Sequence, residues 1–291
     1  MRITIWGCRG SLASPGRHTV RYGGNTSCIE VRHPNGFVVI DAGTGLRPLG
    51  EHLMAELPAR IDLLLTHLHL DHLEGLGFFL PLWHPAMELH IWGPPSPTRT
   101  LQERIARYLS PPLFPIDVSD VPSRLVFHDV PDDPWELAGF RVSAAPVAHP
   151  GPTVGFRLES GMSSIAYIPD HEPALATDLA QIESEWIPGC ELALGVDLLL
   201  HDAQFTDAEY PDRVGWGHSS VTHAVTFALR AGVRRLVLFH HDPWHADGML
   251  DEIEDRARDL WNGNGEPPLL AREGMNLELG SLTASLQEQR A

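Results

Sequence analysis

Cysteine is scarce in this 291-residue chain, which contains only Cys8, Cys28 and Cys190. Three cysteines without a C-x-x-C pair indicate neither a disulfide framework nor a cysteine-ligated zinc site, and this fits a reducing cytosol. Long apolar runs are also lacking. No window approaches the about eighteen apolar residues of a membrane span, and the start, MRITIWGCRG, is too short an apolar stretch for a signal peptide. We therefore expect a cytoplasmic protein without a membrane partner.

Basic residues are few, since 21 lysines and arginines stand against 38 aspartates and glutamates, giving a net charge of −17 with histidine neutral. A long nucleic acid is an unexpected partner, because its phosphates are bound by clustered Lys and Arg. A small phosphate ester held by a metal stays possible, although a local positive centre must overcome the repulsion between like charges. The 17 histidines are the one compositional hint of metal.

The order of apolar segments predicts an α/β protein. No linker or repeat divides the chain, and 43% hydrophobic residues suffice for a sizeable core, so we expect a single domain over residues 1–291. The strands should stack as two central layers with helices outside. Predicted strands are 2–7, 27–33, 36–43, 60–67, 88–94, 139–148, 153–159, 163–169, 195–203, 234–241 and 275–280. Predicted helices are 44–57, one beginning at Asp71, 96–109, 172–186, 220–232 and 246–261, while 110–136 reads as an irregular connection.

Polar residues crowd the stretch LLLTHLHLDHLEG, residues 63–75, directly after an apolar strand. Its His67 and His69 should point to one side of an extended segment. Asp71 and His72 follow at once and can turn toward a second centre. Capping or solvation explains a lone histidine but not this cluster. Imidazole and carboxylate ligands suit zinc, manganese and iron, and a pair of such ions needs more ligands than one loop provides.

Three further residues of ligand type each follow an apolar strand. His149 follows FRVSAAPVA, Asp170 follows SSIAYIP, and His240 follows RRLVLF. Strand ends are rigid positions for a site, so all three could meet the 63–75 stretch at one sheet edge.

With these residues the sequence resembles the metallo-β-lactamase superfamily, whose signature H-x-H-x-D-H stands here as HLHLDH. The resemblance implies a four-layer αββα sandwich and two divalent metal ions, with zinc preferred and manganese or iron also suitable. It implies that the first ion is bound by His67, His69 and His149. The second would be bound by Asp71, His72 and His240, with Asp170 bridging both. His240 is preferred to His241 because LVLFH matches the family's strand-then-histidine pattern. DAGTG also resembles the family, and its Asp41 should support the metal loop.

Two segments narrow the resemblance to the ribonuclease Z-like branch. LLLHDAQF is similar to the His-Glu-Ala-Thr segment of those enzymes, and GHSSVTHAV is similar to their His-Ser-Thr motif. The resemblance implies that Asp202 and His218 form a proton-relay pair, and Asp71 joins them among the predicted catalytic residues. This chain departs from the motif in having Asp for Glu, which shortens the acid by one methylene, and Gln204 for Thr.

The interval from His149 to Asp170 bears on the substrate. Ribonuclease Z-type enzymes usually insert a long tRNA-gripping arm there, but this interval spans only 21 positions with two strand-like segments. Relatives with a short interval include phosphodiesterases that act on small cyclic phosphates, and relatives are often dimers. We therefore expect hydrolysis of a small cyclic or nucleotide phosphodiester by a hydroxide held between two metals, with a homodimer possible. The alternatives are a tRNA 3′-processing ribonuclease, a lactone or thioester hydrolase, and a non-catalytic metal-dependent sensor.

Overall fold

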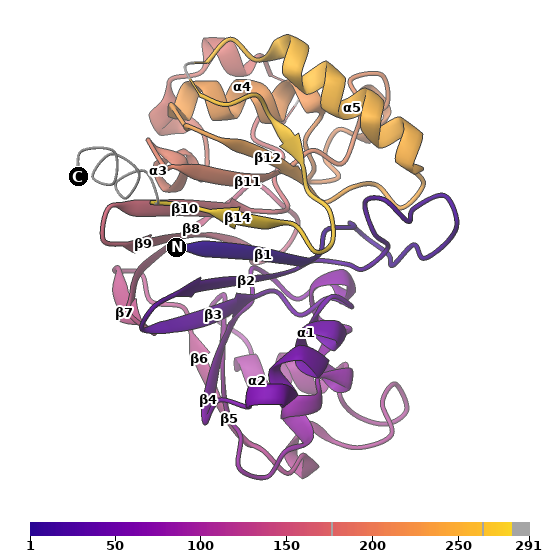
Figure 1. Cartoon of the computed structure of the whole chain (residues 1–291), viewed down its shortest axis with the longest axis vertical. Coiled ribbons are helices and arrows are strands. Elements are labelled where there is room, and N and C mark those ends of the chain that lie inside the picture. The colour runs from indigo at the N-terminus through magenta and orange to yellow at the C-terminus, as the bar shows by residue number, and fades with distance from the viewer. Residues whose placement is uncertain (176, 264, 281–291) are drawn as a thin grey trace, which may run out of the picture.

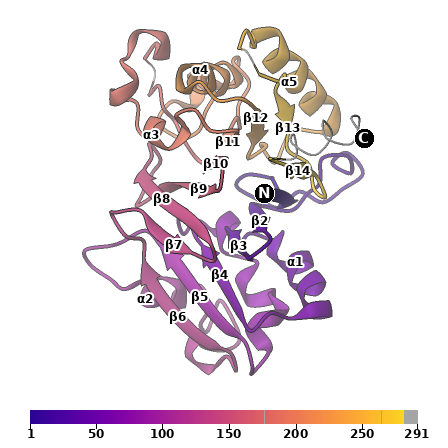
Figure 2. The same ribbon diagram turned by 60° about the vertical axis from the view of Figure 1, so that its left-hand side comes forward.

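Two seven-stranded sheets pack face to face at the centre of the structure, and helices cover their outer faces (Figures 1 and 2). The computed structural model describes residues 1–175, 177–263 and 265–280. The two ends of this described chain meet in the first sheet, where strand β14 (Asn276–Glu278) pairs with β1 (Arg2–Gly7).

The first sheet comes mainly from the N-terminal half of the chain. Its strands β14, β1, β2 and β3 pair antiparallel, and β3, β4, β5 and β6 pair parallel. After β14 and β1, the order continues with β2 (Cys28–His33), β3 (Gly36–Ile40), β4 (Arg60–Leu64), β5 (Glu88–Gly93) and β6 (Arg124–Asp129). The parallel half brings the carboxyl ends of β3 and β4, and the loops that follow them, to one edge of the sheet.

The second sheet has the same mixed character. Its order is β13 (Leu269–Leu270), β12 (Leu236–Phe239), β11 (Leu198–Asp202), β10 (Ser163–Ile168), β9 (Val154–Ser160), β8 (Phe140–Pro146) and β7 (Trp135–Leu137). Strands β10 to β13 are parallel, whereas β7 to β10 are antiparallel. The parallel strands β10, β11 and β12 therefore end side by side, which places Asp170, Asp202 and His240 near one another.

Three apolar clusters hold the layers together. The inner cluster joins both sheets through fully buried side chains such as Ile5, Phe140 and Phe239. The first sheet buries its outer face under α1 (Leu46–Leu53) and α2 (Leu101–Ala106). The second sheet does so under α3 (Cys190–Ala193), α4 (Val221–Ala231) and α5 (Asp247–Leu260). The result is the expected order of helix, sheet, sheet and helix, with α4 and α5 along one side in Figure 1 and α1 and α2 along the other.

Several local predictions are wrong, each for a physical reason. The helix expected from Asp71 is a series of 3₁₀ turns at Leu70–His72, Leu76–Phe78 and Leu80–Trp83, in a stretch interrupted by glycine and proline. The described part of 172–186 likewise forms only the 3₁₀ turns Leu179–Gln181 and Ser184–Trp186.

Strands β6, β7 and β13, which all lie at sheet edges, were not predicted. Strand β6 lies within the stretch 110–136 that was expected to be irregular, and β7 begins in it. The ending of α4 at Gly232 is confirmed, since this residue adopts the left-handed conformation with φ 65°. In the part of the chain that the structure describes, no helix combines the length and hydropathy needed to cross a bilayer.

Truncating a side chain of the inner cluster should destabilise the fold strongly. Phe140 is 0% exposed between the sheets, whereas Phe78 is 60% exposed. We expect Phe140→Ala to lower the free energy of unfolding by about 3–5 kcal/mol, because it removes apolar contacts and leaves a cavity. Phe78→Ala, the matched control, should cost much less. Urea unfolding measures both values, and equal losses would contradict the predicted packing.

Candidate functional site

The loop after strand β4 carries the first four candidate ligands. Its backbone is extended at His69, where φ is −67° and ψ is 154°, and then closes into the 3₁₀ turn Leu70–His72. The tight turn brings Asp71 and His72 back toward the sheet, and both are buried. One short loop therefore presents ligands in two directions, which a continuous helix starting at Asp71 would not do.

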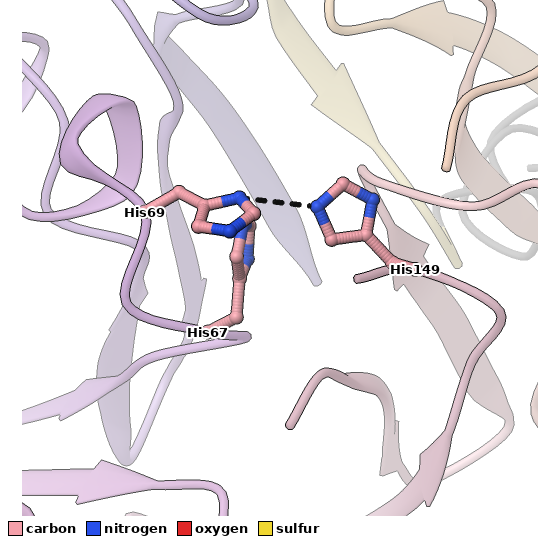
Figure 3. A group of neighbouring side chains, drawn as sticks. All are labelled: His67, His69 and His149. Atoms are coloured by element: carbon pink, nitrogen blue, oxygen red, sulfur yellow. Dashed lines mark hydrogen bonds between the residues drawn. The ribbon is translucent and has the colours of Figure 1, made fainter. Parts of the chain in front are cut away.

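Three histidines form the first group of the site. His67, His69 and His149 place their ligand nitrogens within 4.8 Å of one another. Figure 3 shows the rings of His69 and His149 facing each other, with His67 beside them, and the His149 Nε2 to His69 Nδ1 distance is 3.1 Å. His149 donates its Nδ1–H to the carbonyl of Gly217 at 2.8 Å, which leaves the Nε2 lone pair free for a cation.

Two histidines and two aspartates form the second group. It consists of Asp71, His72, Asp170 and His240, all buried. His240 Nε2 lies 3.1 Å from Asp71 Oδ2 and 3.2 Å from His72 Nε2. The other ring nitrogens of the two histidines are already bound, to Asp41 and Gln204. The two Nε2 atoms therefore converge, and only a proton or a metal cation between them makes that arrangement favourable.

The Asp170 carboxylate lies between the two groups. Its Oδ2 is 3.8 Å from His67 Nε2 and 3.7 Å from His149 Nε2. Its Oδ1 is 3.0 Å from His72 Nε2, while Oδ2 is also 3.3 Å from His240 Nε2. One carboxylate thus faces ligand nitrogens of both groups, which is the placement that a bridging ligand needs.

Unsatisfied buried atoms indicate what the site is built to hold. His67 Nε2 is buried without a hydrogen-bond partner, and Asp170 Oδ1 forms none despite its closeness to His72. Buried polar atoms normally have partners, so their lack here fits atoms reserved for a ligand. Imidazole nitrogens and carboxylate oxygens suit zinc, manganese or iron. The donor set therefore fits two divalent ions, and the seven predicted ligands lie together, while their role as ligands stays a prediction.

The electrostatics also suit cations. Burial holds the pKa of His67, His69 and His149 below the ordinary value, so all three stay neutral and keep a lone pair. Burial opposes charge on Asp170, yet His240 and His72 hold the pKa of its carboxyl well below the usual range. The pKa of Asp71 is likewise held low by His72 despite burial. The first group thus has the neutral imidazoles that metal binding requires. In the metal-free protein, despite burial, Asp170 raises the pKa of His72 well above its ordinary value, so this histidine must lose its proton when a metal binds.

Hydrogen bonds from neighbouring residues, made on the side away from the metal groups, fix the orientation of the predicted ligands. Asp41 accepts from His72 Nδ1 at 2.8 Å and from the Thr66 N–H at 2.8 Å, so it supports the metal loop as expected. The glycine-rich first turn also reaches the site, since the Ser11 N–H donates to Asp71 Oδ2 at 2.7 Å. A Cβ on Gly10 would lie 2.4 Å from His240 Nδ1, so only glycine fits there.

The two residues predicted to form a relay pair are hydrogen-bonded to each other, while their role stays a prediction. His218 Nδ1 donates to Asp202 Oδ2 at 2.7 Å, and the same nitrogen is 3.9 Å from Asp170 Oδ2. Asp202 is fully buried and also accepts the backbone N–H groups of His171, Gln204 and Ser219, which fixes its carboxylate. Although burial opposes the charge, Asp202 raises the pKa of His218 to about 9. The imidazolium therefore persists at neutral pH in the metal-free protein.

Sequence reasoning missed two supporting residues. Gln204 accepts from His240 Nδ1 at 2.9 Å, and its amide donates to Ser11 and Asp242, so its orientation is set by the network. Glu172 accepts the N–H groups of Gly215 and Gly217 and thereby holds the loop that presents His218. In the sequence, Gln204 stands out only as a departure from a motif, and no signal marks Glu172.

His241, the neighbour that competes with His240, points elsewhere. Its Nε2 donates to the carbonyl of Ala271 at 2.7 Å, and burial lowers its pKa to about 3. The positive φ of 62° at His240 turns the two successive side chains apart. The structure therefore places His240, and not His241, among the predicted ligands.

Comparisons with known proteins show the superfamily to which the chain belongs. A family model described as a β-lactamase superfamily domain matches residues 37–241, so the chain belongs to that superfamily, whose members are mostly metal-dependent hydrolases. An uncharacterised protein of Mycobacterium tuberculosis is 31% identical over 253 residues, which cover 84% of this chain and 82% of that protein. Ribonuclease Z of Mycobacterium sp. (strain KMS) is 30% identical over 223 residues, covering 67% of this chain and 70% of that enzyme.

A solved structure confirms the fold prediction. The metallo-β-lactamase fold protein YhfI from Bacillus subtilis superposes with a TM-score of 0.70, covering 95% of this chain and 99% of that one at 19% identity. At that identity the likeness shows the fold alone. The predicted four-layer metallo-β-lactamase sandwich is thereby confirmed.

Removing the carboxylate behind His72 should weaken metal binding. We expect Asp41→Asn to lower the affinity for zinc about 10–100-fold, because the amide holds His72 and Thr66 less firmly. Asparagine tolerates the positive φ of 63° at this position, so the backbone should not change. Competition with a chromophoric chelator measures the affinity. Asp133→Asn, at an exposed loop position, serves as the control, and equal affinities in both variants would contradict the role of Asp41.

The charge on His218 should depend on Asp202. In protein stripped of metal by a chelator, NMR titration of labelled histidine should give His218 a pKa of about 9. Because this exceeds the unfolded value of about 6.5, the stability it contributes is present below pH 6.5 and is lost as the pH rises through about 9. In Asp202→Asn the pKa should fall to or below the unfolded value. An unchanged titration in that variant would contradict the pairing.

Proposed function

We propose that the protein is a dinuclear metal-dependent phosphodiesterase that hydrolyses small cyclic or nucleotide phosphodiesters. The hydrogen bond between His218 and Asp202 carries this proposal, because it places an oriented proton donor beside the candidate metal groups. Hydrolysis of a phosphodiester expels an alkoxide of high pKa, which needs a proton as it leaves. Hydrolysis of a thioester or an activated ester has less need of such a pair, because a thiolate or phenolate leaves without protonation.

The metal groups would supply the charge that the reaction requires. His67, His69 and His149 would hold one ion, Asp71, His72 and His240 the other, and Asp170 both. Divalent ions bound there supply Lewis-acid stabilisation of the phosphoryl oxygens and lower the pKa of water.

The residues of this chain would act on protons and orientation. Asp71 stays ionised and accepts a hydrogen bond from the attacking water. Since His218 Nδ1–H is bound to Asp202, its Nε2–H is the proton available for the leaving oxygen. Asp202 keeps the imidazole charged until that transfer and fixes the plane of the ring. Gln204 accepts a hydrogen bond from His240 Nδ1 and so holds the His240 ring in place in the second group.

Ribonuclease Z activity is the second candidate, because relatives of that name are 30% identical. Two observations favour the smaller substrate. The interval between His149 and Asp170 consists mainly of strands β9 and β10, paired from Ser160–Ser163 to Phe156–Tyr167, so no separate arm projects from it. The net charge of −17 also disfavours a long polyanion.

Replacement of His218 should distinguish proton donation from a structural role. We expect His218→Ala to lower kcat on a cyclic nucleotide about 10²–10⁴-fold, because its alkoxide leaving group needs the acid. The loss on bis(p-nitrophenyl) phosphate should be much smaller, because p-nitrophenolate leaves without protonation. Steady-state kinetics on zinc-loaded protein measure both values, and metal content is determined alongside.

The control is His52→Ala, an exposed histidine on α1, which should leave both rates unchanged. A wild-type kcat on the cyclic nucleotide in His218→Ala would contradict the role of His218 as proton donor. Equal losses on the two substrates would point to a structural effect. Turnover of a lactone panel in place of every phosphodiester would favour the ester-hydrolase alternative.

A further inference from the structure

A cavity beside the metal loop has an unusual charge for this protein. It measures about 590 Å³, and its lining includes His67 and His69 together with Arg99, Arg104 and Arg107. None of its described lining residues is Asp or Glu, although the chain has 38 acidic residues against 21 basic ones. This cavity, here called the arginine pocket, therefore places three arginines next to predicted metal ligands in an otherwise acidic protein.

A role in stabilising helix α2 does not explain why arginines occupy these positions. Arg107 follows the last turn, where a cation is favourable, but Arg99 precedes the N-cap residue Thr100, where the helix dipole disfavours one. Among the residues that the structure describes, no ion pair within 4.0 Å involves Arg99 or Arg107. The adjacent acid, Glu103, is bound by Thr100 in the capping box, and those hydrogen bonds lower its pKa more than the charge of Arg99 does. Two exposed guanidinium groups thus remain available to a ligand.

Arg104 adds a buried donor to the same wall. Its NH2 group donates to the carbonyl of Pro94 at 2.6 Å, which fixes the side chain, and Asp129 is 3.9 Å away. Its Nε is buried and has no hydrogen-bond partner. Because the Pro94 carbonyl holds this side chain in place, the Arg104 guanidinium adds a fixed positive charge to the wall of the cavity.

Apolar side chains complete the cavity. Leu70 is 60% exposed and Leu113 is 71% exposed, and both line it together with Pro150 and Pro152, which follow His149. Exposed large apolar groups beside cations suit a ligand with a flat apolar part and an anionic part. A nucleoside phosphate has both.

We propose that the arginine pocket binds a second phosphate of the substrate, separate from the phosphodiester that is cleaved. This rests on the proposed function and specifies its substrate class: a nucleotide phosphodiester that carries at least one further phosphate group. Guanidinium groups bind phosphate through paired N–H donors, which makes arginine the suited residue. The local positive charge would also draw such an anion to an acidic protein.

Substrate pairs that differ only in the second phosphate test the proposal. One pair is adenosine 2′,3′-cyclic phosphate with and without a 5′-phosphate. The other is thymidine 5′-(p-nitrophenyl phosphate) with and without a 3′-phosphate. We expect the zinc-loaded wild type to prefer the member with the extra phosphate at least tenfold in kcat/KM in one pair. Arg99→Gln/Arg107→Gln should reduce that preference at least tenfold, mainly through KM.

Controls separate charge from folding and from the proposed function. Arg141→Gln, at an exposed position on strand β8 outside this cavity, should keep the wild-type preference. Arg99→Lys/Arg107→Lys, which keeps the charge, should retain part of it. No preference in either pair, or a preference unchanged in the glutamine variant, would overturn the second-phosphate site. Failure of the wild type on all four compounds and on bis(p-nitrophenyl) phosphate would instead overturn the proposed function, and the inference with it.

Discussion

The contact of the Asp170 carboxylate with histidines of both ligand groups is the constraint on which the rest of the site depends. A buried carboxylate costs free energy unless cations or donors surround it. Here His67 and His149 face it from one side, and His72 and His240 from the other. The two sheets must therefore meet so that the ends of β4, β8, β10 and β12 converge, which the apolar layer between them achieves.

The ligand positions could be read from sequence because each is a polar residue that ends an apolar strand. Parallel strands β10, β11 and β12 bring such ends to one edge, so a local pattern predicts a long-range contact. The supporting residues could not be found this way. Gln204 and Glu172 act through hydrogen bonds to His240 and to the backbone of Gly215, and no spacing in the chain encodes those partners.

The fold, too, could be predicted from the sequence only in part. Central strands such as β4 and β11 have continuous apolar runs, because both of their faces are covered, and these runs predicted them. The missed strands β6, β7 and β13 lie at sheet edges, where pairing on one side and partial exposure weaken the pattern. The helix expected at Asp71 failed because the loop is shaped by its contacts with Asp41, Ser11 and His240 more than by helix propensity.

The most direct test of the account is the location of bound metal in a crystal of the zinc-loaded protein. Anomalous diffraction at the zinc absorption edge shows each ion independently of the protein atoms. We expect two peaks per chain, one beside His67, His69 and His149 and one beside Asp71, His72 and His240, with Asp170 between them. A single peak, or zinc bound only elsewhere on the chain, would contradict it.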